Sequence, residues 1–411
     1  MSRHESANPR LIILTQWFDP EPTPKGLAFA QRMAEQGFQV EVVTGFPNYP
    51  GGTVYPGYRI RPLRREQHGQ VLVTRLALYP SHDTGKIGRI LNYLSFFLSA
   101  FVYLTFGARR ADVFYVYHPP LTTALAAACA GWLRRTPFLV DIQDLWPDTL
   151  RATGMIGNSR ILRVVDWLCR WVYRRAAHIV VLSNGFRNLL TARGVPAERI
   201  SVIPNWADES APNEQVEATG QVLGPPGPFR VLFAGNMGPA QDLDTVLDAA
   251  TLLADAPNIE LCLLGSGLET DRLTARRTAE GIDNVRFLPR VSPIEAQACL
   301  RAADALLVHL RDDPLFAITI PSKTQAYLVA GRPVIMAVAG DAADMIRSAE
   351  AGVATRPGDP EELAKAIRDL ASLAPEERAV MGANGQRFYY SHLSLDIGTR
   401  RFATLLRDVI R

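Results

Sequence analysis

The chain has 411 residues, 47% of them hydrophobic and 21% charged, which is an ordinary globular composition. It excludes a wholly disordered, collagen-like or coiled-coil protein, and the length allows two or three domains. The formal net charge of +3 conceals an uneven distribution, because residues 1–206 hold 24 basic and 13 acidic side chains, whereas residues 207–411 hold 20 and 28. We therefore expect the first half to meet an anionic partner.

Short apolar runs alternate with helix-length segments through the first half of the chain. A polar N-terminus leads into the first run without the long apolar segment of a signal peptide, so secretion is not expected. Residues 27–36 are expected to form an amphipathic helix, because their apolar residues recur at helical spacing. The expected strands are residues 11–15, 40–44, 71–75, 113–117, 138–141, 179–182 and 200–203.

The second half repeats this alternation. Most expected strands of both halves are apolar throughout, which is typical of parallel strands covered on both faces. The last segment, 392–411, is expected to be a helix with one apolar face. The other expected helices are residues 243–254, 269–281, 293–303, 322–330 and 361–373, and the expected strands are residues 230–234, 259–264, 285–287, 305–308 and 333–337.

These patterns predict an α/β protein with two doubly wound domains. We place the boundary after Trp206, because residues 207–228 have the composition of a loop or linker. In open parallel sheets, ligands bind outside the carboxyl ends of the strands. The candidate functional residues are therefore those that follow the strands directly.

Three segments of the first half fit this rule. Lys25 and Gly26 end a proline-rich loop before the first helix, whose N-terminus is expected to favour an anion, although a simple turn explains the pattern too. His118 ends a strand, where it either hydrogen-bonds a ligand or packs in the sheet. The third segment, residues 141–148, holds three carboxylates and a tryptophan, which suit acid/base work, a metal, sugar hydroxyls or helix capping.

Two glycine pairs and one lysine stand out in the second half. Gly235 and Gly238 follow one strand, and Gly265 and Gly267 follow the next, as suits close backbone approach to an anion. Lys323 is expected in the first turn of a helix that Ser322 caps. A cation there opposes the helix dipole, so we expect an anionic ligand at this helix end.

The run from Ile90 to Phe106 contains no charged residue and is flanked by arginines. A spanning helix needs about 20 apolar residues, so we expect either a core helix or one lying in the plane of a membrane, and we favour membrane contact. A second aromatic and basic segment, residues 167–175, adds to this expectation. Such segments also suit RNA, but no RNA-binding motif accompanies them.

Five segments resemble the family 4 retaining glycosyltransferases of GT-B fold, and the resemblance covers almost the whole chain. They are IPN at 203–205, VLFAGN at 231–236, LLGSG at 263–267, NVRFL at 284–288 and residues 321–334. Other segments resemble a narrower bacterial branch that includes L-fucosamine (N-acetyl-fucosamine, FucNAc) transferases of capsule and O-antigen assembly. They are residues 16–26, GFPNYPGG at 45–52, DLWPD at 144–148 and residues 320–327.

The resemblance implies two Rossmann-like domains facing a central cleft. Residues 1–206, completed by the helix 392–411, would bind the acceptor, and residues 207–391 would bind the nucleotide sugar. His118 and Lys323 would be catalytic, with no cofactor and no obligatory metal. The implied acceptor-binding residues are Tyr49, Asp144, Trp146 and Asp148, and the implied donor-binding residues are Lys25, Gly26, Gly235, Asn236, Gly238, Gln241, Gly265, Gly267, Leu288, Arg290, Val291, Ser322, Thr324 and Gln325.

The chain departs from the family pattern at the donor site. Many members have two glutamates with seven residues between them, and the matching positions here are Ile318 and Ala326. The family's diphosphate-neutralising Arg and Lys match Asn236 and Gln241. Lys323 and backbone N–H groups must therefore do more, or Arg290, Arg311 or Gln325 replaces the missing contacts.

The activity implied by the resemblance is transfer of a sugar, with L-FucNAc as the first candidate, from a UDP donor to an undecaprenyl-diphosphate-linked saccharide. The expected place is the cytoplasmic face of a bacterial cell membrane, without nucleic acid. Alternatives are a sugar-nucleotide epimerase of the same fold, an inactive sugar-nucleotide-binding scaffold, and a two-domain binding protein that closes on a small ligand.

Overall fold

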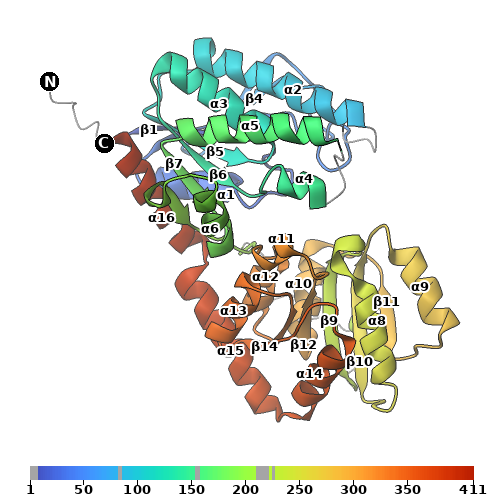
Figure 1. The fold of residues 1–411 in the computed structure, drawn as a ribbon. Coiled ribbons are helices and arrows are strands. Elements are labelled where there is room, and N and C mark those ends of the chain that lie inside the picture. Colours follow the sequence, from blue (N-terminus) through green and yellow to red (C-terminus); the bar gives the residue numbers. More distant parts are fainter. Residues whose placement is uncertain (1–7, 82–85, 153–157, 210–221, 225–226) are drawn as a thin grey trace. The chain divides into compact units, whose positions relative to one another are not determined.

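The computed structural model describes residues 8–81, 86–152, 158–209, 222–224 and 227–411, which form two compact units (Figure 1). Among these residues, unit 1 runs to Leu182 and includes Phe186–Ile203 and Leu395–Arg411. Unit 2 comprises Ser183–Gly185 and Pro204–Ser394. The units thus divide close to Trp206, and most of the expected linker lies outside the described residues.

Unit 1 is built on an eight-stranded sheet of order β3-β4-β2-β1-β5-β6-β7-β8. All neighbours pair in parallel except β3, which is antiparallel to β4. The strands are β1 (Arg10–Leu14), β2 (Gln39–Gly45), β3 (Leu63–His68), β4 (Val71–Leu76), β5 (Val113–His118), β6 (Phe138–Ile142), β7 (His178–Val181) and β8 (Ile200–Val202).

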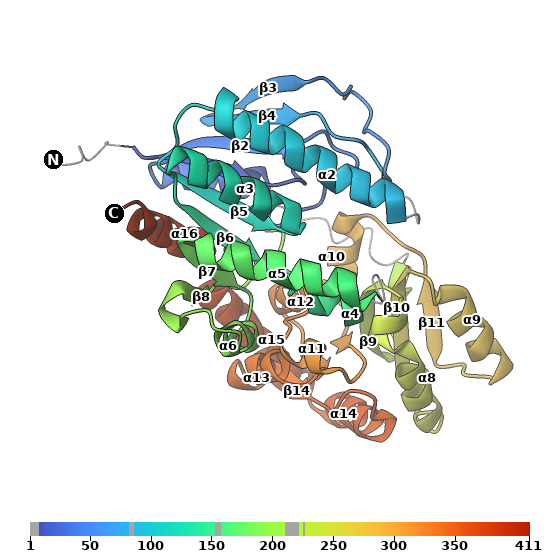
Figure 2. The same cartoon turned by 45° about the horizontal axis from the view of Figure 1, so that its top comes forward.

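Helices cover both faces of this sheet. Figure 2 shows α2, α3 and α5 side by side over one face, while α1 and α16 pack together against the other. The helices are α1 (Leu27–Glu35), α2 (Lys86–Val102), α3 (Leu121–Arg134), α4 (Asp148–Ala152), α5 (Ser159–Arg175), α6 (Asn184–Ala192) and α16 (Leu395–Ile410), with a π-helical turn η1 (Tyr103–Gly107) and a 3-10 turn η2 (Ala197–Arg199).

The last helix, α16, is fixed to unit 1 by an aromatic cluster that surrounds a buried cation. Phe402 is fully buried, and its ring centroid lies 5.5 Å from that of Phe29 and 5.4 Å from that of Tyr115, both with edge-to-face geometry. The Lys25 ammonium lies 4.9 Å from the Phe402 centroid and 3.9 Å from an Asp141 carboxylate oxygen. A buried ion pair of this kind tolerates little displacement, because each charge loses its water on burial.

Unit 2 contains a six-stranded, fully parallel sheet of order β11-β10-β9-β12-β13-β14. Its main core is buried between the sheet and helices α8 and α14, and it includes Val231, Leu247 and Ile367. The strands are β9 (Phe229–Asn236), β10 (Ile259–Ser266), β11 (Val285–Leu288), β12 (Ala305–His309), β13 (Val334–Ala337) and β14 (Gly352–Ala354). The helices are α8 (Leu243–Leu252), α9 (Thr270–Ala279), α10 (Pro293–Ala302), α11 (Pro314–Ala317), α12 (Lys323–Ala330), α13 (Asp341–Ser348), α14 (Pro360–Ser372) and α15 (Pro375–His392), with a 3-10 turn η3 (Pro239–Gln241).

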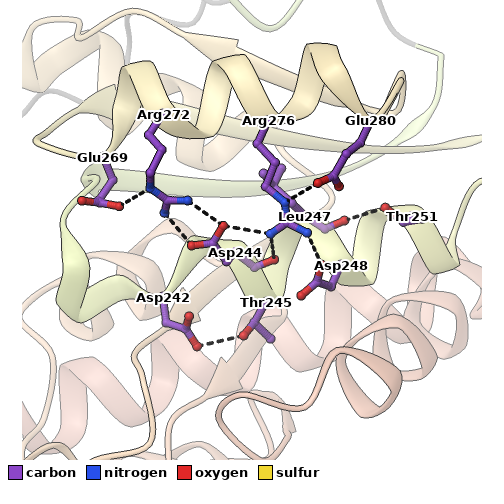
Figure 3. A network of polar contacts seen from close by, with 10 residues as sticks. All are labelled: Asp242, Asp244, Thr245, Leu247, Asp248, Thr251, Glu269, Arg272, Arg276 and Glu280. Carbon is purple, nitrogen blue, oxygen red and sulfur yellow. Dashed lines mark hydrogen bonds and ion pairs between the residues drawn. The ribbon is translucent and has the colours of Figure 1, made fainter.

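A polar network joins α8 to α9 at the surface of unit 2 (Figure 3). Arg272 donates two hydrogen bonds to Asp244, at 3.0 and 2.5 Å, and Arg276 donates to the same carboxylate at 2.8 Å. Arg276 also binds Asp248 and Glu280. Exposed ion pairs stabilise a protein by only about 0.2–1 kcal/mol each, so the buried core, not this network, holds the unit together.

The structure confirms the two parallel α/β sheets expected from the sequence, and it adds two strands. β3 was missed because Leu63–His68 is polar at almost every position, as an edge strand tolerates. β14 was missed because it has only three residues. The expected final helix also begins three residues later, because His392 ends α15 and α16 begins at Leu395.

Replacing Phe402 by alanine should lower the free energy of unfolding by about 3–5 kcal/mol, because the substitution leaves a cavity beside Phe29 and Tyr115. Thermal and urea unfolding would measure the loss. Thr404→Ala, at an exposed position of the same helix, is the control and should change stability little. Equal stability of the Phe402 variant and the native protein would contradict the proposed role of the cluster.

Candidate functional site

Strands β9 and β10 of unit 2 end side by side, with Gly235 opposite Gly265 and Asn236 opposite Ser266. A pocket of about 290 Å³ lies at these strand ends, where parallel sheets place their ligands. It gathers five residues that the sequence analysis had marked as donor-binding, which come from three separate segments. Its lining is Ala234, Gly235, Asn236, Leu264, Gly265, Ser266, Arg290, Val291 and Ala296.

The glycines at this edge have a packing role of their own. A Cβ atom at Gly265 would lie 2.1 Å from the Gly235 carbonyl oxygen, and one at Gly267 would lie 2.3 Å from the Met237 carbonyl oxygen. The Gly267 N–H donates to Thr270 Oγ1 at 2.8 Å, and the Gly238 N–H donates to Gln241 Oε1 at 3.0 Å. Close packing of the two loops therefore requires the glycines, and two of their N–H groups already have partners inside the protein.

Lys323 begins α12 and extends its side chain back to β9. Its ammonium lies 3.5 Å from the ring centroid of Phe233, and a Cβ atom at Gly235 would be 3.3 Å from Nζ. Nζ is out of water and has no hydrogen-bond partner among the described residues. Burial lowers the pKa of Lys323 to about 7, because a charged ammonium loses its hydration there. An anion placed beside Gly235 would supply the missing partner.

Two further polar side chains of this region were not marked in the sequence. His309 ends β12, is fully buried, and places Nδ1 2.8 Å from the Gln241 carbonyl oxygen, while its Nε2 has no partner among the described residues. Tyr327 of α12 accepts a hydrogen bond from the Ala234 N–H at 2.8 Å. The position of His309 at a strand end, like that of His118, was the signal that could have identified it.

The remaining donor candidates lie around Lys323 and β11. Ser322 precedes α12 in helical conformation and makes no side-chain cap, so the expected capping role is wrong. Thr324 and Gln325 are buried, and their side-chain oxygens Oγ1 and Oε1 lack hydrogen-bond partners within the described chain. Leu288 ends β11 and is buried, two residues before Arg290, and it does not line the pocket.

In unit 1 the N-terminus of α1 is occupied by the protein's own carboxylate. Asp19 Oδ2 accepts a hydrogen bond from the Leu27 N–H at 2.6 Å, and a Cβ atom at Gly26 would lie 2.2 Å from that oxygen. Gly26 thus makes room for Asp19 at the place where the sequence suggested a phosphate. The Lys25 side chain is fully buried, and its burial lowers its pKa to about 8 while Asp141 acts in the opposite direction.

Asp141 is an internal residue of the same cluster. One of its carboxylate oxygens accepts from Tyr115 OH at 2.5 Å and the other accepts from Gln143 Nε2 at 2.8 Å. Burial raises the pKa of Asp141, and the charge of Lys25 opposes that rise. The three carboxylates of residues 141–148 therefore do not act as one group, since Asp141 stabilises the interior.

His118 ends β5 and is fully buried. Neither ring nitrogen has a hydrogen-bond partner in another residue of the described chain, and the ring meets that of Trp146 edge-to-face at 6.0 Å. Burial lowers the pKa of His118 to about 4, so the imidazole is neutral at pH 7. A neutral imidazole can both donate to and accept from a sugar hydroxyl.

The predicted acceptor residues occupy two segments of unit 1, the loop that carries Tyr49 and residues 144–148, the last of which begins α4. Asp144 is partly buried and desolvation raises its pKa, whereas Asp148 binds Arg193 at 2.7 Å. Tyr49 packs against Trp17 with 4.9 Å between ring centroids. Glu21, which was not marked, accepts the backbone N–H groups of residues 48 and 49 at 2.7 Å and so fixes the loop that carries Tyr49.

Two family profiles match the chain, one for each unit. Residues 27–206 match the glycosyl transferase 4-like domain and residues 217–388 match the glycosyl transferases group 1, so that together they cover most of the sequence. The second half of the chain belongs to the group 1 glycosyltransferases, and the first half to the glycosyl transferase 4-like domains. A relative over nearly full length is "Putative colanic acid biosynthesis glycosyl transferase WcaI" of Escherichia coli (strain K12), 28% identical over 394 residues, which are 92% of this chain and 96% of the relative.

Solved glycosyltransferase structures share the fold. HepE of Anabaena, determined with UDP and glucose, superposes with a TM-score of 0.66 at 18% identity and covers 98% of this chain and 100% of its own. Sucrose-phosphate synthase of Thermosynechococcus elongatus gives 0.72 at 16% identity, over 98% and 99% of the two chains. The two family profiles make the protein a glycosyltransferase, and these structures show its GT-B fold, as the sequence motifs predicted.

The ligands of a glycosyltransferase suit two buried groups, the Lys323 ammonium and the His118 imidazole, which lack hydrogen-bond partners in other residues of the described chain. A glycosyltransferase must hold a charged leaving group and orient a sugar, and Lys323 and His118 offer a cation and a neutral imidazole respectively. Among the described residues no group of three or more His, Cys, Asp or Glu side chains lies close enough together to hold a metal ion. The individual site residues stay predictions until they are tested.

The His118 ring should remain neutral throughout the physiological range, and ¹⁵N NMR of the imidazole would measure this. We expect no titration between about pH 5.5 and 8, because burial disfavours the charged form. Since its pKa is lowered in the folded state, its contribution to stability is complete above the ordinary value of 6.5 and is lost as the pH falls toward about 4. Protonation near pH 6.5 would contradict the buried geometry.

Proposed function

We propose that the enzyme transfers an N-acetylated deoxyhexosamine, with L-FucNAc as the first candidate, from a UDP-sugar to a polyprenyl-diphosphate-linked saccharide in capsule or O-antigen synthesis. The anomeric configuration is retained. Unit 2 binds the donor and unit 1 the acceptor. The chain works at the inner face of a bacterial cell membrane.

The observation that carries the donor assignment is the Lys323 ammonium beside Gly235. A diphosphate at the ends of β9 and β10 would face a desolvated cation and the backbone of the glycine loop. When the sugar–phosphate bond breaks, negative charge grows on the leaving diphosphate, and Lys323 stabilises that charge. The proton of the acceptor hydroxyl passes to the departing phosphate oxygen as the new glycosidic bond forms.

The family's arginine and lysine at the diphosphate are absent here, and another residue of the pocket takes over their contacts. Asn236 and Gln241 hydrogen-bond one another at 3.4 Å, where the family has an arginine and a lysine. Arg290 is exposed at the pocket edge, while Arg311 is paired with Asp313 at 3.3 Å. We therefore assign the second donor-binding cation to Arg290 in preference to Arg311.

The relatives support the class of donor and of pathway. The name of the E. coli relative places it in the synthesis of colanic acid, a polysaccharide, and HepE was solved with UDP. The sugar itself rests on the sequence segments 45–52 and 144–148. A screen of UDP-sugars against polyprenyl-diphosphate-saccharides in membranes, with products identified by mass, tests donor and acceptor together. Epimerised or hydrolysed UDP-sugar without acceptor would identify an epimerase instead, and binding without turnover a scaffold.

Replacing Lys323 by alanine should lower kcat by at least about 100-fold, because the leaving diphosphate loses its positive partner. Initial rates on the donor found by the screen would measure the loss. Lys365→Ala is the matched control, since Lys365 is exposed on α14 and forms an ion pair with Asp369 of the same helix. Wild-type turnover in the Lys323 variant would refute the assignment.

The affinity for UDP should weaken as the pH rises above about 7, by up to about tenfold per unit. The free ammonium has a pKa of about 7, and a bound diphosphate favours its charged form, so UDP binding at pH 8 takes up a proton. Calorimetry in buffers of different ionisation enthalpy counts that proton. Lys323→Met should bind UDP more weakly and without proton uptake; uptake that persists in this variant would assign the proton to another group.

A further inference from the structure

Helix α2 has two different sides, and the structure settles which one faces outward. With its π-helical end it forms a segment, Ile87–Gly107, of 21 residues that is long and apolar enough to cross a membrane. Only 28% of its most apolar window is buried, so it is not a core helix. The large apolar residues exposed along it, here called the outer stripe, are Ile87, Ile90, Leu91, Leu94, Leu98, Val102 and Phe106.

The polar side chains of the same helix face the protein. Asn92 accepts from Gln16 Nε2 at 2.5 Å and donates to the Tyr79 carbonyl at 2.8 Å. Ser99 donates to the Ala77 carbonyl at 2.6 Å. These two residues belong to a row of four hydrogen-bonded groups, here called the inner stripe, which comprises Asn92, Ser95, Ser99 and Tyr103.

The inner side also buries Phe96, Ala100 and Leu104, so it packs like the inner side of other surface helices. The outer side differs from that of a surface helix in water, which is polar. The inner stripe also excludes a spanning helix, because its hydrogen bonds hold α2 against the sheet from Asn92 to Tyr103. The Tyr103 hydroxyl donates to the buried Glu41 at 2.6 Å, and Arg134 of α3 donates to the Leu104 and Ala108 carbonyls. The helix is fixed to unit 1 with its apolar side out.

Neighbouring helices extend the apolar surface. On α3, Trp132 and Leu133 are exposed, and on α5 Ile161, Val164 and Trp167 are exposed. Because α3 packs against both α2 and α5, these side chains belong to one layer of three helices over the sheet (Figure 2). Tryptophan is typical of the boundary between lipid headgroups and acyl chains.

The charges on this layer identify its partner. On α5, Arg160, Arg163, Arg174 and Arg175 are all exposed, and Arg175 lies 4.6 Å from the Trp171 ring centroid. The three helices contain one carboxylate, Asp166, which is paired with Arg170 at 2.8 Å. A second copy of this face would bring arginines against arginines, whereas anionic headgroups would neutralise them.

We infer that the face formed by α2, α3 and α5 docks in the plane of an anionic lipid leaflet, with the outer stripe of α2 entering the acyl boundary and the arginines of α5 in the headgroup layer. The inference does not depend on the transfer reaction, since vesicle binding needs neither donor nor acceptor. The protein can therefore bind UDP in solution even if it does not dock on lipid, and it can dock on lipid even if it does not bind UDP.

Purified full-length protein should co-sediment with phosphatidylglycerol-containing vesicles and much less with phosphatidylcholine alone. Leu94→Glu combined with Leu98→Glu should lower partition by about 100-fold or more, because two exposed leucines no longer enter the acyl boundary. Val380→Glu is the control, since Val380 on α15 and Leu98 are both 60% exposed. Arg160→Gln with Arg163→Gln should remove the preference for anionic lipid. Circular dichroism checks that each variant is folded.

Two results would overturn the inference. One is a folded Leu94/Leu98 variant that binds vesicles as well as the native protein. The other is a native protein that does not bind vesicles but forms a dimer in light scattering, together with a Leu94/Leu98 variant that is monomeric. That outcome would assign the face to a second copy of the chain. Depth is checked by Trp132→Phe combined with Trp167→Phe, which should lower the fluorescence quenched by lipids brominated near the headgroup, because both exposed tryptophans of this face are then absent.

Discussion

The ammonium of Lys323 lies out of water against the Phe233 ring, at the point where β9 ends. Such a group is stable as a cation only beside an anion, and burial lowers its pKa to about 7. The strand order of the unit 2 sheet places the Lys323 ammonium at this point. Strand β9 lies between β10 and β12, and the carboxyl end of β9 faces the first turn of α12. The pocket, the glycine loops and the proposed diphosphate are all arranged around this one charge.

Unit 1 also contains a lysine ammonium that is out of water, but there the protein itself supplies the anionic partner. Lys25 is buried along its whole length, whereas Lys323 is buried at its ammonium. Asp141 and two aromatic rings surround the Lys25 ammonium, so its charge holds α16 to the sheet. Asp19 likewise takes the N-terminus of α1 that an anionic ligand would need. Two lysines with buried ammonium groups, each beside a helix start, thus have different roles because of the partners that the fold supplies.

The two proposed ligands of the chain fit its uneven charge, with 24 basic and 13 acidic side chains in residues 1–206 and 20 and 28 in residues 207–411. The acidic half would bind the proposed nucleotide diphosphate through a local cation, not through net charge. Many of its carboxylates pair with arginines at the surface, as between α8 and α9. The basic half places exposed arginines on α5 beside apolar side chains of α2 and α3. This distribution suits one unit that meets a lipid surface and another that meets a small soluble donor.

Sequence periodicity was sufficient for most strands, because buried parallel strands are apolar throughout; it failed for β3, whose edge position permits a polar sequence. The strand-end rule identified Gly235 and Gly265, and the family resemblance added Arg290; the structure brings all three into one pocket. It missed His309, whose role depends on Gln241, a residue 68 positions away.

Residue order by itself determined the two α/β sheets and the location of the donor candidates, since both follow from local patterns repeated along the chain. Only the tertiary structure decided that Lys25 has a carboxylate partner and that Lys323 has no hydrogen-bond partner among the described residues. It also decided which side of α2 faces outward. Helical spacing reveals two stripes on α2, but their direction depends on Gln16, Glu41 and Tyr79. Those residues lie in other segments, and folding alone brings them within hydrogen-bonding distance of the inner stripe.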